Sequence, residues 1–488
     1  MEHSRHSGRK FACDAIHHLA AALALSIATV CAHSAHASEA ITVTPLTQLP
    51  GGNGNWGVSC VSGNGLWLAG GCNDGVWGRA CLWNAEGFPT TIGDLPGYPQ
   101  SGGNGISYFG TVIVGSASPV GSNGSDVRAF RWSSESGMID IGNLNGATRN
   151  GAYATNFDGS TVVGFSGDRA FRWTASSGMT DLGLPADALN RSAISVSGDG
   201  NTVVGFSSQR DFWGVYYIPF VWTPSEGARN LAALPDCREG YPSAVNRDGT
   251  VIVGQSYEWN TGRRGHAAKW TPAGVQDLGA LGTGWYSYAS HVSANGQVIL
   301  GGSGPQNEPN TFPTPWIWTP ATGMQRLADY LVSKGANLSG IPQPMWISGM
   351  SADGSTIALS GGNAGSMSFL ISSIPVPQDS DGDGILDEQD NCPAIANPTQ
   401  ADCNSNGIGD VCEIAAGAPD LNADTIPDTC QCLADLFVDH QVNGADLGAL
   451  LSQWGPANAS TVSDMNRDGQ VNGADLGYLL NAWGPCTN

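Results

Sequence analysis

The stretch GAYATNFDGSTVVGFSGDRAFRWTASSGMTDLG, residues 151–183, decides the fold because its pattern recurs along most of the chain. It predicts a short strand, a D-G turn, a Val-rich strand ending in Gly, the aromatic strand AFRW and a closing strand. Similar stretches begin at Ser192 and Pro242, at a period of about fifty residues. The Trp of the third strand marks six such units, at Trp83, Trp132, Trp173, Trp222, Trp270 and Trp318.

The two ends of this repeat region complete each other. The last unit, ISGMSADGSTIALSGGNAGSMSFLIS from Ile347, has three predicted strands and no closing strand, whereas ITVTPLTQLPGG from Ile41 is a strand without a unit. Pairing of these two segments closes a ring. We therefore predict an all-β main domain over residues 41–374, a seven-bladed β-propeller, with six or eight blades as the alternatives.

Two units, AFRWSSESGMIDIGNLNG and AFRWTASSGMTDLG, resemble the HAF repeats of bacterial extracellular proteins. The resemblance covers about 330 residues, and the first and last units depart from it. It implies a fold and an extracellular location. It implies no chemistry, since the matching residues belong to strands and turns.

The N-terminus predicts export. Arg9 and Lys10 precede the apolar run AIHHLAAALALSIATVCA, and AHA at Ala35 to Ala37 has the small residues of a cleavage site. We interpret residues 1–37 as a signal peptide of a protein that is secreted or held at the cell surface. A membrane anchor is the alternative, but the run is shorter than the ~20 residues that a span needs. No later segment is apolar enough to form a transmembrane helix in the mature chain.

Cysteine use fits an oxidising compartment. Ten of the twelve cysteines follow the signal peptide, and six of them lie in the acidic end of the chain. We expect disulfides there, but six cysteines allow 15 pairings and the sequence selects none. Zinc bound at Cys430 and Cys432 is the rival interpretation, although no second pair has the usual ligand spacing.

Negative charge is concentrated at the C-terminal end. From residue 379 onward there are 18 Asp and Glu and one basic residue, Arg467, so this part carries 17 of the 22 net negative charges. Localised charge of one sign usually has a counterion. We expect no nucleic-acid partner, because no basic stripe is present to neutralise phosphates.

The stretch DSDGDGILDEQDNCP from Asp379 has oxygen ligands at the spacing of a Ca²⁺ loop, with Gly at the sixth position for a sharp turn. DCNSNGIGDVCE and DLNADTIPDTCQ repeat the spacing, although Thr425 replaces the Gly in the latter. Residues 379–432 resemble thrombospondin type 3 repeats, which implies bound Ca²⁺ and disulfide cross-links. The predicted ligands are Asp379, Asp381, Asp383, Ile385, Asp387, Asp390, Asp402, Asn404, Asn406, Ile408, Asp410, Asp420, Asn422, Asp424 and Asp428.

Residues 433–488 contain a duplication, DLFVDHQVNGADLGALLSQWGP and DMNRDGQVNGADLGYLLNAWGP. Each copy has a twelve-residue acidic loop followed by apolar residues at helical spacing. We expect the two apolar stripes, Leu447, Leu450, Leu451 and Trp454 and the matching Leu476, Leu479, Leu480 and Trp483, to bury each other. The predicted Ca²⁺ ligands are Asp435, Asp439, Asp446, Asp464, Asn466, Asp468, Gln470 and Asp475.

This pair resembles a type I dockerin, a small α-helical EF-hand-like module that binds Ca²⁺ and docks into cohesin domains. The first copy departs from the pattern, since Phe437 and His440 replace a ligand and the turn Gly, so we expect weak or absent Ca²⁺ binding there. In the family, loop positions 10 and 11 help to choose the cohesin. Their identity in both copies implies a near two-fold partner-binding face; they are Gly444, Ala445, Gly473 and Ala474. An EF-hand pair kept only as a folded cap is the alternative.

The propeller shows no motif of catalysis. The recurring acids Asp158, Asp199, Asp248 and Asp353 sit in D-G turns, as a β-turn requires. The other acids are expected in loops, at Glu226, Asp236, Glu239, Glu258 and Glu308. Aromatic residues, also expected in loops, suit contact with a glycan or a protein, unless they only cap the propeller. They are Trp213, Tyr216, Tyr217, Trp259, Trp285, Tyr286 and Tyr288.

These features predict a non-catalytic, extracellular calcium-binding protein. The propeller would present a surface to a glycan or protein, and the dockerin-like end would attach it to a cohesin-type scaffold or the cell surface. The alternatives are a polysaccharide-degrading enzyme, a hydrolase or lyase with its site on the propeller, and a structural component of the envelope.

Overall fold

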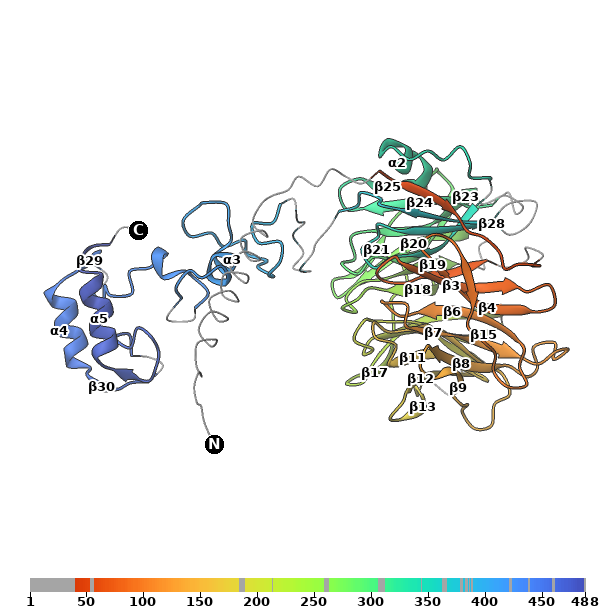
Figure 1. Cartoon of the computed structure of the whole chain (residues 1–488), viewed down its shortest axis with the longest axis horizontal. Coiled ribbons are helices and arrows are strands. Elements are labelled where there is room, and N and C mark those ends of the chain that lie inside the picture. The colour runs from red at the N-terminus through yellow and green to blue at the C-terminus, as the bar shows by residue number, and fades with distance from the viewer. Residues whose placement is uncertain are drawn as a thin grey trace, which may run out of the picture.

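Seven antiparallel sheets of four strands each form a closed β-propeller in the computed structural model (Figure 1). The prediction of seven blades is therefore confirmed. The structure describes residues 40–52, 57–183, 189–212, 214–258, 263–305, 312–343, 345–361, 367–377, 381, 385, 387, 389–420, 424–437, 439–458 and 461–486. The proposed signal peptide, residues 1–37, lies outside this described part.

Six blades are built from four consecutive strands. The first is β2 (Val58–Val61), β3 (Trp67–Asn73), β4 (Gly78–Asn84) and β5 (Pro89–Thr91), followed by β6 (Gln100–Ile106), β7 (Val112–Ser118), β8 (Arg128–Ser133) and β9 (Gly137–Asp140). The third is β10 (Asn150–Thr155), β11 (Thr161–Ser166), β12 (Arg169–Thr174) and β13 (Gly178–Asp181), followed by β14 (Asn190–Val196), β15 (Val203–Asp211), β16 (Gly214–Thr223) and β17 (Gly227–Asn230). The fifth is β18 (Glu239–Val245), β19 (Ile252–Glu258), β20 (Arg263–Thr271) and β21 (Gly274–Asp277), followed by β22 (Trp285–Val292), β23 (Ile299–Pro305), β24 (Thr314–Thr319) and β25 (Gly323–Arg326).

The seventh blade joins the two ends of the domain. Strand β1 (Thr42–Pro45) pairs antiparallel with β28 (Met367–Ser372), beside β27 (Ile357–Gly361) and β26 (Met345–Met350). Thr42 lies opposite Ser372 and Pro45 opposite Phe369. The N-terminal strand therefore supplies the fourth strand that the last repeat lacks, as the sequence predicts.

Hydrophobic burial lies between the blades. Seven separate clusters of buried side chains each combine residues of two neighbouring sheets. The Val-rich second strands have runs of consecutive buried residues, four of them in β11, because both faces of a blade are covered. A Cβ on Gly164, which ends this run, would collide with the carbonyl oxygen of Gly151. The close approach of these two neighbouring strands therefore requires glycine at this position.

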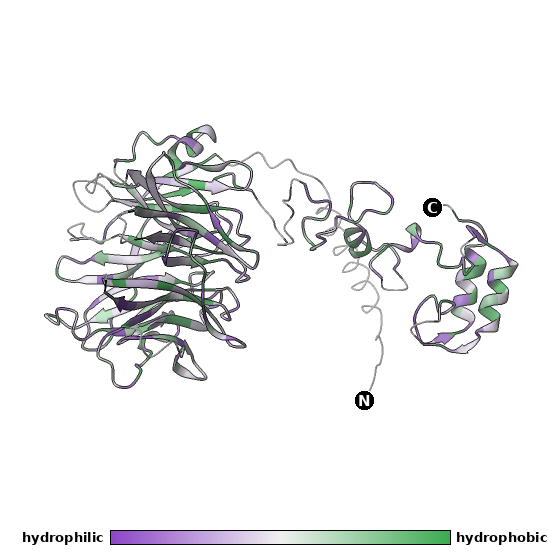
Figure 2. Cartoon of the chain, turned by 180° about the vertical axis from the view of Figure 1, so that it is seen from behind, coloured by the Kyte–Doolittle hydropathy of each residue, from purple (hydrophilic) through white to green (hydrophobic). Residues whose placement is uncertain are grey.

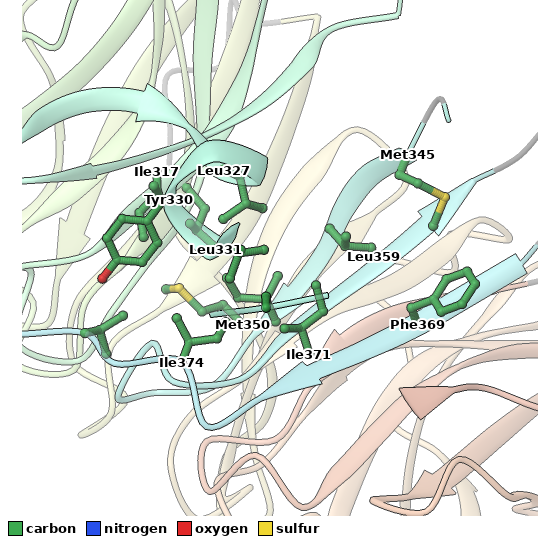
Figure 3. Close-up of a cluster of buried hydrophobic side chains, with 14 of the residues drawn as sticks. Ile317, Leu327, Tyr330, Leu331, Met345, Met350, Leu359, Phe369, Ile371 and Ile374 are labelled. Atoms are coloured by element: carbon green, nitrogen blue, oxygen red, sulfur yellow. The ribbon is translucent and has the colours of Figure 1, made fainter. Parts of the chain in front are cut away.

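The cluster between the sixth and seventh blades includes a helix as well as strands. Helix α2 (Leu327–Ser333) buries Leu327, Tyr330 and Leu331 against Ile317 of β24 and Ile371 of β28 (Figure 3). Val43 of β1 packs against the same cluster. The closing strand is therefore held by side-chain packing as well as by its main-chain ladder.

A ring of main-chain hydrogen bonds joins the turns after the seven inner strands. In each turn of the form Ser/Asn-x-x-Gly, the second residue accepts an N–H from the preceding blade. The seven bonds measure 2.6 to 3.3 Å and run from Asn64 to Tyr108, Tyr108 to Phe157, Phe157 to Gly198, Gly198 to Arg247, Arg247 to Ala294, Ala294 to Ala352 and Ala352 to Gly63. Because only the main chain is used, the side chain at this position is free to vary.

The turn residues that the repeat does keep have structural roles. The first residue is a buried Ser or Asn whose side chain accepts the N–H five residues later, as Asn156 does from Thr161 at 2.9 Å. The Gly has a positive φ, 77° at Gly159, which an L-residue rarely adopts. A β-bulge also interrupts the inner strand of every blade, as between Ala152 and Ala154. The sequence analysis did not anticipate this bulge.

The C-terminal part contains few regular elements. Helix α3 (Asp410–Ala415) and the short 3₁₀ helix η2 (Asp428–Cys430) interrupt an irregular segment, and helices α4 (Gly444–Ser452) and α5 (Gly473–Asn481) follow. Four two-residue strands cross-connect the last two units: β29 (Gln441–Val442) pairs with β32 (Gly484–Pro485), and β30 (Gly455–Pro456) pairs with β31 (Gln470–Val471). Each loop therefore pairs with the segment after the other unit's helix.

Three disulfides staple this part, Cys392–Cys412, Cys403–Cys430 and Cys432–Cys486, and a fourth, Cys72–Cys81, joins β3 to β4. Cys430 and Cys432 therefore belong to two different disulfides. The zinc interpretation of this pair is wrong, because a disulfide sulfur is not the thiolate that zinc binds.

We expect the closing strand to be needed for the stability of the whole ring. Val43→Asp places a charge against the buried cluster and should lower the free energy of unfolding by at least about 2 kcal/mol. Thr42→Asp places the same charge on the exposed face of β1 and is the matched control. Thermal and denaturant unfolding of the two variants measure the difference; equal stability would contradict a structural role for β1.

Candidate functional site

The acidic loops share one hydrogen-bond pattern. In the last loop, Asp464 at position 1 accepts the N–H of Asp468 at 3.1 Å and that of Gly469 at 3.0 Å, and Asp468 accepts the N–H of Gln470 at 2.9 Å. The same bonds to positions 5 and 6 are made by Asp402, Asp420 and Asp435. The Asp carboxylate at position 1 therefore holds each loop in its folded shape. The first dockerin-like loop has this geometry despite Phe437 and His440.

The sixth position is left-handed in all four loops. The φ angle is 83° at Gly407 and 86° at Gly469, but also 71° at Thr425 and 63° at His440. An L-residue in this region costs roughly 1–2 kcal/mol, and a β-branched residue is particularly unfavourable there. Thr425 and His440 therefore keep the loop shape under strain.

Position 12 of the two dockerin-like loops is completely buried. Asp475 accepts the N–H of Met465 at 2.9 Å through one oxygen and that of Asn472 at 2.9 Å through the other. Asp446 makes the matching bonds to Leu436 and Asn443, both at 2.8 Å. Each carboxylate thus ties the start of its loop to the N-terminus of the following helix, where a negative charge is also favoured by the helix dipole.

The surroundings of one carboxylate, that of Asp390, show whether a cation would fit the first loop. Oδ1 of Asp390 accepts the N–H of Cys392 at 2.7 Å and the Nε2 of Gln400 at 2.8 Å. Oδ2 is buried and has no hydrogen-bond donor among the described residues. A buried carboxylate oxygen left in this way is costly unless a cation meets it, and oxygen ligands are those that Ca²⁺ prefers. The residues present therefore fit Ca²⁺.

A further residue of the second loop was missed by the sequence analysis. The carboxylate of Glu413, at position 12, accepts the side-chain amides of Asn404 at 3.0 Å and Asn406 at 2.7 Å. At the same position of the next loop, Gln431 donates to Asp424 at 2.7 Å. The signal was present in the sequence, because position 12 is an acidic ligand position in the EF-hand spacing.

The structure does not bring every predicted ligand together. Among the described residues, three Cys, His, Asp or Glu ligand atoms lie within 4.8 Å of one another in only two places, and both include a disulfide. The carboxylates of Asp464, Asp468 and Asp475 do not form such a group. Asp410 is buried and accepts the N–H of Cys403 at 2.9 Å. Asp379, Asp383 and Asn422 lie outside the described residues, whereas Asp381, Ile385, Asp387, Ile408 and Asp428 lie within them.

The expected burial of both apolar helix stripes is wrong for half of their members. Leu450 and Leu479 are completely buried between the helices with Val442, Met465 and Val471. Leu447 and Leu476 are half-buried and pack against this cluster. The other four members of the stripes are about half exposed: Leu451 52%, Trp454 50%, Leu480 54% and Trp483 50%. Figure 2 shows the hydrophobic residues along α4 and α5. The predicted partner-binding residues Gly444, Ala445, Gly473 and Ala474 are all exposed at the starts of these helices.

The propeller contains a cavity of about 790 Å³ lined mainly by tyrosines. Tyr217 comes from β16, Tyr241 from β18, Tyr257 from β19, and Tyr286 and Tyr288 from β22. The placement of the described aromatic residues in loops is therefore wrong, since Tyr216, Tyr217, Trp285, Tyr286 and Tyr288 lie in strands. Trp213 and Trp259 lie outside the described residues.

Burial raises the pKa values of three phenols in the cavity wall. It raises the pKa of Tyr241 to about 12, and burial also raises the pKa values of Tyr257 and Tyr288. Aromatic rings back the cavity wall, with Tyr241 4.6 Å from Phe206 between ring centroids and Tyr217 5.3 Å from the same ring. The phenols therefore offer both hydroxyl donors and ring faces at neutral pH.

Only one carboxylate lines the described part of this cavity. Glu239 is buried in β18, not in a loop as expected, and accepts the N–H of Tyr217 at 3.2 Å. Glu258 also lies at the end of a strand, β19, whereas Glu226 and Asp236 lie in turns and Glu308 is outside the described residues. The turn acids behave as predicted: Asp158, Asp199, Asp248 and Asp353 each accept the N–H two residues later.

Comparison with known families gives one match, in the acidic segment. Residues 377–400 match the thrombospondin type 3 repeat. This repeat is a calcium-binding element, which agrees with the buried oxygen of Asp390 within the matched range. No curated protein matches the chain. No helix among the described residues has the length and apolar character of a membrane span.

Solved structures resemble the propeller in fold. Oligogalacturonate lyase from Vibrio parahaemolyticus is 11% identical, with a TM-score of 0.46, over 68% of this chain and 97% of that chain. Virginiamycin B lyase from Staphylococcus aureus is 12% identical, with a TM-score of 0.41, over 68% and 98%. TolB from Acinetobacter baumannii is 16% identical, with a TM-score of 0.32, over 48% and 52%, so the match spans about half of that protein.

Relief of the strained turn should stabilise the third acidic loop. Thr425→Gly removes the cost of a left-handed L-residue and adds the smaller chain-entropy cost of glycine. At saturating Ca²⁺, protection of the loop amides against hydrogen exchange should therefore rise about twofold to fivefold. The reciprocal control, Gly407→Thr at the equivalent exposed position, should lower it. Changes of the same sign in both variants would contradict the argument.

Proposed function

We propose that this protein is an extracellular, non-catalytic calcium-binding protein. Its propeller presents a ligand-binding surface, and its C-terminal pair docks, in the manner of a dockerin, into a cohesin-type partner on a scaffold or cell surface. Ca²⁺ orders the acidic segment between the two. The observation that carries the docking proposal is the duplicated, half-exposed apolar set Leu451, Trp454, Leu480 and Trp483.

The duplication supports a near two-fold docking face. Each helix begins with the same exposed Gly-Ala pair, each ends before an exposed Trp, and each loop pairs with the segment after the other helix. Large apolar groups that are exposed in equivalent places usually mark an interaction surface. A folded cap alone would not need them, because Leu450 and Leu479 already form the buried contact.

A binding role for the propeller is favoured over hydrolysis. Glycan hydrolysis generally uses two carboxylates, one of them as an acid and the other as a base or nucleophile. The described lining of the tyrosine cavity contains Glu239 alone. The remaining wall, with its rings, hydroxyls and Gln255, suits a bound ligand.

Removal of Ca²⁺ should affect one part of the molecule selectively. With a chelator, the acidic loops lose the cation that offsets carboxylate repulsion, so amides from residue 389 onward should lose protection against hydrogen exchange. The propeller amides should keep theirs, because the interblade clusters contain no such loops. Equal loss of protection in both parts, or none in the acidic loops, would contradict the calcium role.

Docking should depend on Ca²⁺ and on both copies of the apolar set. The immobilised full chain, offered cohesin-type domains, should capture one of them with Ca²⁺ and none with chelator. Replacement of Leu451 and Trp454 by Ala should leave docking through the second copy, as should replacement of Leu480 and Trp483, whereas the fourfold variant should bind at least about a hundredfold more weakly.

The control for this experiment is Tyr216→Ala, far from the C-terminal pair in β16. Circular dichroism with Ca²⁺ checks that each variant is folded. Failure to capture any cohesin-type domain, or capture that survives the fourfold change, would overturn the docking role.

A further inference from the structure

The tyrosine cavity lies along the inner strands of neighbouring blades. Glu239, Tyr241 and Ser243 alternate along β18 and all line it, as do Tyr286 and Tyr288 of β22. Alternate residues of a strand point to the same side, and successive residues advance about 3.3 Å, so the β18 residues span roughly 13 Å. This cavity, called the tyrosine pit below, therefore follows roughly 13 Å of the inner wall.

The opposite ends of the same strands are narrower. Val245 of β18 and Val292 of β22 line a much smaller hollow, of about 200 Å³, together with the turns of the main-chain ring. There the Tyr108 ring stacks on Phe157 at 4.3 Å, and the Arg247 guanidinium lies 4.6 Å from the Phe157 ring. The end with the tyrosines therefore has about four times the room of the other end, and we expect a sugar chain to enter there.

The lining combines ring faces with neutral hydrogen-bonding groups. Tyr217, Tyr241 and Tyr288 offer rings and hydroxyls, and Ser243 and Gln255 add further donors and acceptors. A sugar ring has the complementary surface, since its C–H face packs on aromatic rings while its hydroxyls hydrogen-bond at the edge. The volume falls within the roughly 300–1,000 Å³ of ligand pockets, which admits a short oligosaccharide and excludes a folded domain.

The charge of the site selects among glycans. No described lining residue is basic, and Glu239 contributes a carboxylate. Uronates, sulfated sugars and phosphates would meet like charge without a lining cation. Uncharged sugars meet no such penalty.

We propose that the tyrosine pit binds the end of a neutral glycan chain. The inference rests on the proposed ligand-presenting role of the propeller and names its ligand class. One or more terminal sugar rings enter the pit and stack on its tyrosines, and the rest of the chain extends outward from the mouth.

Titration calorimetry of the full chain with Ca²⁺ tests this, using cellotetraose, xylotetraose, mannotetraose and chitotetraose, with tetragalacturonate as the charged comparison. At least one neutral tetrasaccharide should bind, and tetragalacturonate should not. Tyr288→Ala should weaken binding at least about tenfold. Tyr241→Phe, which keeps the ring and removes only a hydroxyl, should weaken it less. Tyr216→Ala is the matched control, because Tyr216 lies in β16 outside the pit lining, beneath Arg238 at 4.3 Å.

The stoichiometry with the long polymer of the bound sugar separates end recognition from side-on binding. One protein per chain end supports the proposal, whereas a number that grows with chain length overturns it. Binding of tetragalacturonate alone, binding of no neutral sugar, or binding unaffected by Tyr288→Ala also overturns it. The calcium-dependent capture of a cohesin-type domain is measured on the same preparation, so a failed sugar titration with intact capture removes this inference and leaves the docking role standing.

Discussion

Closure of the ring is the constraint on which the rest of the propeller depends. No blade has a core of its own, because the buried clusters lie between neighbouring sheets. A blade at an open end would expose one apolar face and one unpaired strand edge. The fourth strand supplied by β1 and the ring of turn-to-turn hydrogen bonds remove both problems at once. The tyrosine cavity exists only because this closure fixes the inner strands of neighbouring blades side by side.

Much of this architecture could be predicted from the sequence, because it rests on side-chain patterns. Strand alternation, the D-G turns and the incomplete last unit led to seven blades and to the pairing of β1 with β28. The inner ring and the bulges could not be found in this way. The ring uses main-chain groups at a position occupied by residues as different as Gly198 and Arg247, which leaves no residue signature.

The errors at the candidate sites have similar physical causes. Trp454 and Trp483 were placed on helix faces, but α4 ends at Ser452 and α5 at Asn481, so helical spacing does not apply to them. The tyrosines were placed in loops because they lie outside the repeating Trp positions, although Tyr286 and Tyr288 show the alternation of a strand. The acidic loops were predicted more fully, since metal-ligand spacing is written directly in the residue order; the pairing of their cysteines was not.

The disulfides of the C-terminal part have a mechanical consequence. Cys432–Cys486 joins two residues 54 apart, so it withholds on the order of 190 Å of extended chain from a force that acts across these two residues. The crossed pairs Cys392–Cys412 and Cys403–Cys430 shorten the path through the acidic segment in the same way. When one end of the molecule is held and flow drags on the other, tension passes from disulfide to disulfide. Under such tension the segment after the propeller would therefore lengthen far less than a chain without cross-links, even when its loops open.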